Sequence, residues 1–139
     1  MKISVLIALL LALAIPIFAE IATQPTAEAN LDTALVSGKP TIALFIKSKA
    51  CACTAKKCNA AGATFSQIVS DSSSEYTYLM VDIDKQPEYT KKLKLVAVPT
   101  AVFFDAFGSE VTRLSSWDMN AENISEALNS ITTPKKTTN

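Results

Sequence analysis

Histidine is absent from this 139-residue sequence, tryptophan occurs once, and cysteine occurs only three times. Without histidine, no imidazole can complete a zinc site or carry a proton to or from a neighbouring thiol. An excess of either charge is also absent, because 13 lysines and arginines balance 13 aspartates and glutamates. We therefore expect neither nucleic acid nor an anionic membrane surface as a partner.

The first 19 residues have the pattern of a cleaved secretory signal peptide. Lys2 gives a positive start, an apolar run covers residues 3–13, and Pro16 precedes a cleavage position after Ala19. The apolar stretch is shorter than the roughly 20 residues of a spanning helix, which disfavours a permanent anchor. We expect an exported protein, periplasmic or secreted, with no stable membrane association once the peptide is removed.

Removal of residues 1–19 takes away one lysine and no acid, which leaves a net charge of −1. The remaining chain of about 120 residues suffices for one domain. We assign residues 20–27 to a polar linker, 28–132 to the domain and 133–139 to a polar tail. Outside the cytosol disulfides persist, so an odd number of cysteines leaves one thiol without an intramolecular disulfide partner.

Apolar residues recur along the domain in helical and strand patterns. Two nearly continuous apolar runs, TIALFIK at 41–47 and YTYLMVDID at 76–84, are typical of strands buried on both faces. The expected elements, in chain order, are a helix at 28–36, a strand at 41–47, a helix from Thr54 that ends before Asp71, a strand at 76–84, a helix at 86–95, strands at 100–105 and 110–117, and a helix capped by Asn120. This order predicts an α/β fold with a four-stranded mixed sheet. A parallel βαβ unit and an antiparallel hairpin form the sheet, and helices cover both faces.

All three cysteines, Cys51, Cys53 and Cys58, lie within KACACTAKKC at 49–58. Residues 33–70 contain five lysines and no acid, and the positive end of the predicted helix points at Cys53. Both features lower a thiol pKa, and the thiolate is the form that attacks disulfides and binds metals. We therefore expect thiolate character at Cys51 and Cys53.

The sequence leaves three disulfide pairings open. Cys53 and Cys58 would lie about 8–9 Å apart on a regular helix, whereas the Cα atoms of a disulfide are within roughly 7 Å. Their bond therefore requires Cys53 to lie outside the helix. Cys51 and Cys58 can pair if the loop folds back. Cys51 and Cys53 can close a small, strained ring, whose high reduction potential suits an oxidant or an isomerase.

Three functions fit such a cluster. The first is thiol–disulfide exchange. The second is a site for a soft metal ion such as Cu(I), held by the thiolates of Cys51, Cys53 and Cys58. The third is a non-catalytic module in which the cysteines only brace a surface loop. Asp82 and Asp84, by contrast, are interpreted as a turn at a strand end and not as a catalytic carboxylate pair.

Three segments resemble the thioredoxin-like family, from about residue 28 to residue 131. TIALFIKSKACAC is similar to the family's central strand and cysteine motif, and AVFFDAFGSEVTRL to its closing hairpin. VDIDKQPEYTKKLKLVAVPT is similar to the strand, turn, short helix and Val-Pro-Thr between them. The resemblance implies the thioredoxin fold, with a cis peptide bond before Pro99 that faces the cysteines. A cis bond costs least before proline, and the Val98 amide and carbonyl can then pair with a substrate strand.

The cysteine motif departs from the Cys-x-x-Cys of the family. Ungapped alignment from the proline places Cys58 at the second, resolving cysteine of the family and Ala55 at its first. The loop before the helix would then have gained about five residues. Leu44 and Phe45 stand where the family often has a buried acid.

These observations predict an exported thiol–disulfide oxidoreductase that acts on the thiols and disulfides of exported proteins. Cys53 or Cys51 would attack, Cys58 would resolve the mixed disulfide, and the backbone of Val98–Thr100 would hold the substrate strand. We expect a monomer that needs no cofactor.

Overall fold

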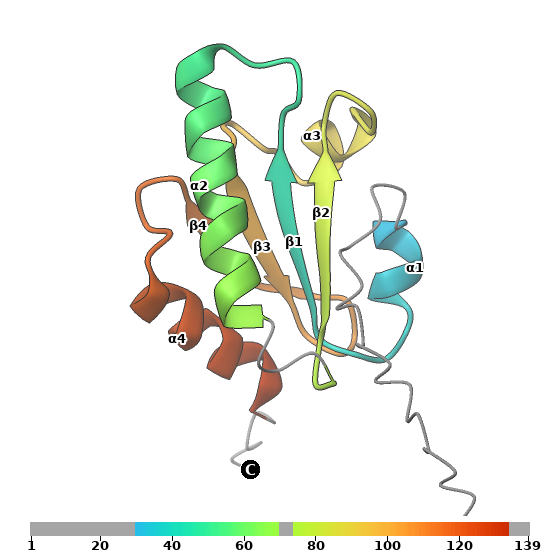
Figure 1. Cartoon of the computed structure of the whole chain (residues 1–139). Helices are drawn as coiled ribbons and strands as arrows, with labels where there is room; N and C mark the ends of the chain where they lie inside the picture. The colour runs from blue at the N-terminus through green and yellow to red at the C-terminus, as the bar shows by residue number, and fades with distance from the viewer. Residues whose placement is uncertain (1–29, 70–73, 134–139) are drawn as a thin grey trace, which may run out of the picture.

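Eight helices and strands follow one another along the part of the chain that the computed structural model describes, residues 30–69 and 74–133 (Figure 1). In chain order they are α1 (Leu31–Leu35), β1 (Thr41–Ile46), α2 (Ala52–Val69), β2 (Thr77–Asp82), α3 (Glu88–Lys92), β3 (Thr100–Phe104), β4 (Glu110–Ser115) and α4 (Ala121–Thr132). The predicted signal peptide and linker lie outside the described residues, as does the tail from residue 134. None of the described helices is long and apolar enough to cross a membrane.

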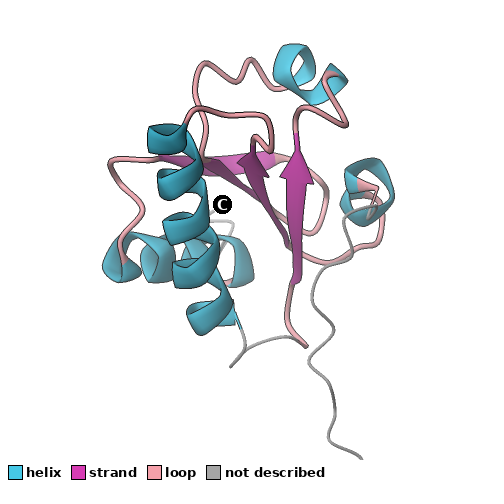
Figure 2. Ribbon diagram, turned by 45° about the horizontal axis from the view of Figure 1, so that its top comes forward, coloured by secondary structure: helices cyan, strands magenta, loops and turns pink. Residues whose placement is uncertain are grey.

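The four strands form one mixed sheet in the order β2-β1-β3-β4. β1 and β2 run parallel, whereas β3 pairs antiparallel with both β1 and β4. Helices lie on both sides of the sheet (Figure 2). The α2 crossover between the parallel strands and the closing β3–β4 hairpin confirm the predicted topology.

The central strands β1 and β3 are buried on both faces, which explains their uninterrupted apolar runs. The prediction that the strand within 76–84 is also buried on both faces is wrong, because β2 lies at an edge of the sheet and Thr77, Tyr78 and Met80 are only half-buried. Side chains alternate between the faces of a strand, so Ile42 and Leu44 pack with α2 and α4, whereas Ala43 and Phe45 pack with α1 and α3. Phe65, which has no exposed surface, fixes α2 to the sheet. The helix that carries two of the cysteines therefore has a fixed position over the central strands.

Several element ends differ from the prediction by one to three residues, and two of these differences affect the site. β4 ends at Ser115, two residues early, because a turn closes there. The Asp118 amide donates to the Ser115 carbonyl at 3.0 Å, and the Ser115 hydroxyl donates to the Asp118 carboxylate at 2.5 Å. α2 begins at Ala52, two residues before the predicted start at Thr54, so Cys53 lies within the helix.

Gly108 lies in the turn between β3 and β4, where the backbone has a φ of +75°. A Cβ atom there would lie 2.8 Å from the carbonyl oxygen of Leu35, at the end of α1. Gly38 has a similar φ of +77°, but nothing lies within 4 Å of the corresponding position. Glycine is thus needed at 108 for both backbone conformation and packing, and at 38 for conformation alone.

We expect Gly38→Ala to lower the free energy of unfolding by about 1–2 kcal/mol, the cost of a left-handed conformation for a residue with a side chain. Gly108→Ala should lower it by roughly 1–3 kcal/mol more, because the added methyl group overlaps the Leu35 carbonyl. Urea denaturation of the two variants measures the difference. Equal losses would show that the hairpin turn does not press against α1.

Candidate active site

The cysteine segment, residues 49–58, and the proline segment, residues 97–100, lie at the same end of the sheet (Figure 1). β1 and β2 end there, and β3 begins there, because β3 runs antiparallel to β1 with Thr100 opposite Phe45. The loop after Ile46 and the segment before Thr100 therefore leave the sheet from neighbouring strands. This arrangement brings the predicted catalytic and substrate-binding segments to one end of the molecule.

A turn after β2 holds the loop between β1 and α2. The Ser48 amide donates to the Asp82 carboxylate at 3.2 Å, and the Lys49 amide donates to the Asp84 carboxylate at 2.6 Å. The Asp84 amide also donates to Asp82, at 3.0 Å. Burial raises the pKa of Asp82, but hydrogen bonds from Ser48 and Asp84 outweigh it, and the net pKa lies below its ordinary value. Asp82 and Asp84 form the predicted turn, and they also position the cysteine loop.

Cys51 immediately precedes α2, and its carbonyl accepts a helical hydrogen bond from the Ala55 amide at 2.9 Å. It therefore occupies the N-cap position, whose side chain ordinarily accepts hydrogen bonds from the second and third helical residues. Those residues are Cys53 and Thr54. The Cys51 sulfur lies 2.8 Å from the Cys53 sulfur and 3.3 Å from the Thr54 hydroxyl oxygen. A cysteine, and not the predicted Thr54, caps this helix.

These hydrogen bonds lower the pKa of Cys51 to about 6. The Cys53 thiol makes the largest contribution, and the hydroxyl and backbone amide of Thr54 follow. At pH 7 about nine-tenths of Cys51 is therefore thiolate, against a few per cent of an ordinary cysteine with a pKa of about 8.5. The sequence predicted that nearby lysines would lower this pKa, but no lysine is among the groups responsible.

Cys58 lies apart from the other two cysteines. It is buried in the second turn of α2, whereas Cys51 and Cys53 are exposed, and all three are free thiols. At 1.5 Å per helical residue, about 7.5 Å of helix axis separates Cys58 from Cys53 and about 10.5 Å separates it from Cys51. A disulfide spans less than either distance. The structure thus brings Cys51 and Cys53 together and leaves Cys58, the predicted resolving residue, out of reach.

The three thiols do not form a common ligand set. Within residues 30–69 and 74–133, no group of three or more histidine, cysteine, aspartate or glutamate side chains is arranged to hold a metal ion. The alternative Cu(I) site, with Cys51, Cys53 and Cys58 all as ligands, is therefore not assembled in this conformation.

The Val98–Pro99 peptide bond is cis, as predicted, and Pro99 is fully buried. Val98 is partly buried, and neither its amide nor its carbonyl has a hydrogen-bond partner among the described residues. Both groups are therefore free to pair with an extended substrate segment. Thr100 begins β3, and its hydroxyl donates to the Ala97 carbonyl at 2.7 Å. The Thr100 side chain is thus engaged within the proline segment itself.

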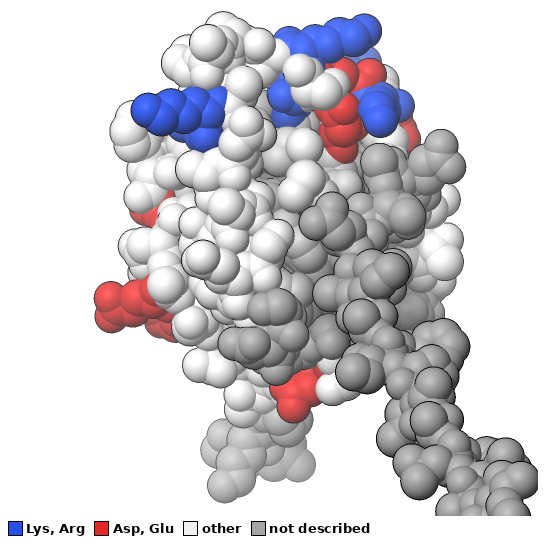
Figure 3. Space-filling view, in the orientation of Figure 1, with Lys and Arg blue, Asp and Glu red and all other residues white. Residues whose placement is uncertain are grey.

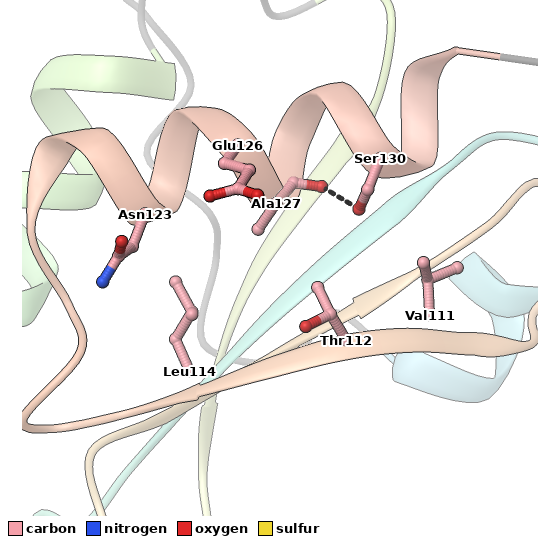
Figure 4. A pocket seen from close by; sticks show the side chains of 7 residues that line it. All are labelled: Val111, Thr112, Leu114, Asn123, Glu126, Ala127 and Ser130. Carbon is pink, nitrogen blue, oxygen red and sulfur yellow. Dashed lines mark hydrogen bonds between the residues drawn. The ribbon is translucent and has the colours of Figure 1, made fainter.

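Two hollows on the described part of the surface have no cysteine in their lining. One, of about 270 Å³, adjoins the proline segment and is lined by Val96, Thr100 and Arg113, among others. The other, of about 310 Å³, lies between β4 and α4 (Figure 4). There the Ser130 hydroxyl donates to the Ala127 carbonyl of its own helix, so it is not activated as a nucleophile. Cys51 and Cys53 lie outside both hollows and are exposed.

Basic side chains gather at the end of the molecule where α2 begins. In the view of Figure 3, lysine and arginine atoms lie at the upper end, whereas acidic side chains also reach the lower half. The ammonium of Lys57, in the second turn of α2, lies 4.2 Å from the ring centre of Trp117, which is 81% exposed. This cation–π contact joins the start of α2 to the turn after β4.

Solved structures of several thioredoxins match this arrangement of strands and helices. The thioredoxin of Malassezia sympodialis aligns with a TM-score of 0.60 at 17% identity, over 73% of this chain and 83% of that one. The oxidised thioredoxin of Plasmodium falciparum aligns with a TM-score of 0.58 at 18% identity, over 73% and 89% of the two chains. The thioredoxin of Fasciola hepatica aligns with a TM-score of 0.56 at 23% identity, over 68% and 82%. The protein has a thioredoxin fold.

No family model and no curated protein sequence matches the chain. In its thioredoxin fold the cysteine pair Cys51-x-Cys53 lies where β1 leads into α2. Sequence reasoning missed two contacts of this site. The hydrogen bond between Cys51 and Thr54 follows the N-cap to N3 spacing, so a local pattern could have revealed it. The bond between Lys49 and Asp84 joins residues 35 positions apart and has no local pattern.

Thr54→Val keeps the size of the side chain but removes the hydroxyl that bonds to the Cys51 sulfur. We expect the pKa of Cys51 to rise towards the ordinary value of about 8.5, so that iodoacetamide alkylates it severalfold more slowly at pH 6. Thr64→Val is the matched control on the same helix, because the Thr64 hydroxyl donates to the Ala60 carbonyl. Peptide mapping by mass spectrometry reports the pH profile of Cys51 alone. An unchanged profile in Thr54→Val would contradict the role assigned to this hydroxyl.

Proposed function

We propose that the protein is an exported thiol–disulfide oxidoreductase in which Cys51 is the nucleophile and Cys53 is the resolving thiol. The thioredoxin fold supports a thiol-related redox role at the coarser level. The observation that carries the finer proposal is the 2.8 Å separation of two exposed sulfurs, one of which has a pKa of about 6. A nucleophile that is ionised at neutral pH and a second thiol in contact with it are the two requirements of disulfide exchange.

The exchange needs two successive displacements. The Cys51 thiolate attacks one sulfur of a substrate disulfide, so that a mixed disulfide forms and the other substrate sulfur leaves as a thiolate. Cys53 then attacks the Cys51 sulfur, which releases the second substrate thiol and forms a Cys51–Cys53 disulfide. Two electrons pass from the protein to the substrate, and the reverse sequence oxidises a substrate dithiol. Because a Cys-x-Cys ring is small and strained, the oxidised pair is expected to favour oxidation of substrate thiols, and the thiolate of the reduced pair can start isomerisation of substrate disulfides.

The protein substrate would be held by the segment that includes Pro99. The free amide and carbonyl of Val98 are suited to pair with an extended backbone, as a sheet edge does. The Cys51–Cys53 pair lies on open surface, which suits a protein disulfide presented on a loop. We assign Cys58 a structural role, because a buried helical thiol at this distance does not reach Cys51 without unwinding the helix.

We further propose that the protein acts after export, in the periplasm or the extracellular medium, on thiols and disulfides of other exported proteins. The support is the signal-peptide pattern of residues 1–19 and the persistence of disulfides outside the cytosol. The near-neutral charge and the surface position of the pair are consistent with a monomer that binds its substrates transiently.

Reduction of insulin disulfides by dithiothreitol, followed by turbidity, tests the proposal. Cys51→Ser and Cys53→Ser should each reduce the catalysed rate to the background level, because one removes the nucleophile and the other the resolving thiol. Cys58→Ser is the matched control and should keep the rate within about twofold of the wild type. Circular dichroism checks that each variant is folded. Full activity in folded Cys51→Ser, or background activity in folded Cys58→Ser, would contradict the assignment of roles.

A further inference from the structure

The Cys51–Cys53 pair combines three properties that matter for oxidants other than disulfides. Cys51 is exposed, and its sulfur is mostly ionised at pH 7. The Thr54 hydroxyl oxygen is 3.3 Å from that sulfur. The Cys53 sulfur is 2.8 Å away and is itself exposed. Together these atoms form a nucleophile, a hydrogen-bond donor beside it and a second thiol in contact.

We propose that Cys51 also reduces hydroperoxides, with hydrogen peroxide as the simplest example, and that Cys53 converts the product on Cys51 into a disulfide. This activity uses the same two sulfurs as the proposed exchange but does not require a substrate strand or the proline segment. It therefore extends the function of the site to a second class of oxidant.

The reduction of a hydroperoxide balances in atoms and electrons with the thiols of Cys51 and Cys53. The Cys51 thiolate attacks the outer oxygen of the peroxide, so that an S–O bond forms, the O–O bond breaks and the alkoxide or hydroxide leaves. The leaving oxygen takes a proton from water, and Cys51 becomes a sulfenic acid. Cys53 then attacks the Cys51 sulfur and expels the hydroxyl group as water. One peroxide is reduced to an alcohol or water, and two thiols are oxidised to one disulfide.

The contact between the two sulfurs decides the fate of the sulfenic acid. A second peroxide molecule would oxidise it irreversibly to a sulfinic acid. Well-oriented groups within one molecule react with effective concentrations of about 10⁵ M or more, whereas peroxide in a typical experiment is millimolar. Cys53 therefore captures the sulfenic acid first, and the site is protected from irreversible oxidation. Cys58, buried in the second turn of α2, takes no part.

The fold should accelerate the first step. At pH 6 about half of Cys51 is thiolate, against about 0.3% of a thiol with a pKa of about 8.5, but the more acidic thiolate is about tenfold less nucleophilic. The net expectation is a reaction with hydrogen peroxide about tenfold faster than that of a synthetic peptide of residues 49–58. The peptide has the same cysteines but no folded helix to hold them.

The test treats the reduced protein with one equivalent of hydrogen peroxide at pH 6, then quenches by alkylation and maps the peptides by mass spectrometry. The expected product is a Cys51–Cys53 disulfide with Cys58 unmodified, and Cys58→Ser is the control that should react identically. Cys53→Ser should stop at a sulfenic acid that dimedone labels. In excess peroxide, Cys53→Ser should accumulate sulfinic acid on Cys51 while the wild type does not.

A wild-type rate equal to that of the peptide would overturn the inference, and so would equal sulfinic acid formation in the wild type and Cys53→Ser. Parallel insulin assays on the same samples separate the two proposals. If insulin reduction is catalysed and either overturning result appears, disulfide exchange stands and the peroxide activity fails. If the peroxide results are as expected and insulin is not reduced, the peroxide activity stands and disulfide exchange fails.

Discussion

The first amide groups of a helix have no acceptor within the helix, and at the start of α2 the sulfur of Cys51 takes that place. The Cys53 thiol, the Thr54 hydroxyl and the Thr54 amide all donate to it, and together they hold it as a thiolate. The same geometry brings the second sulfur within 2.8 Å. The reactivity of the site and the identity of its second cysteine therefore both follow from the choice of N-cap residue.

Two sets of contacts fix this helix start in space. Ring contacts of Phe65 hold α2 against the sheet. The Phe65 ring centre lies 5.7 Å from that of Tyr78, on which the ring stacks, and 6.2 Å from that of Phe103. The carboxylates of Asp82 and Asp84 hold the loop before Cys51 through backbone amides. The proline segment leaves the adjacent strand at the same end. A site without histidine thus obtains an ionised nucleophile from hydrogen bonds and a rigid scaffold, and it has no need of a neighbouring base.

The fold was predictable from the sequence, whereas the cysteine pairing was not. The apolar runs at 41–47 and 76–84 predicted the parallel strands β1 and β2, although β2 lies at a partly exposed edge. The closing hairpin follows from its turn residues, so local patterns sufficed for the topology. The pairing depends on whether α2 begins at Ala52 or at Thr54. Both starts have a plausible cap, and a shift of two residues moves Cys53 into the helix and away from any bond with Cys58. Nearby lysines were expected to lower the pKa of Cys51 by electrostatic attraction. An exposed ammonium is screened by water, however, and hydrogen bonds at contact distance determine the pKa of Cys51.

The most direct test of this account is the disulfide that forms when the reduced, folded protein is equilibrated with oxidised glutathione. Proteolysis without reduction, followed by mass spectrometry, identifies the bonded residues. The account predicts an intramolecular bond between the two exposed sulfurs at the head of α2, with Cys58 recovered as a free thiol. A bond that includes Cys58 as the main product would contradict it, because that bond requires the first turns of α2 to be unwound in the working protein.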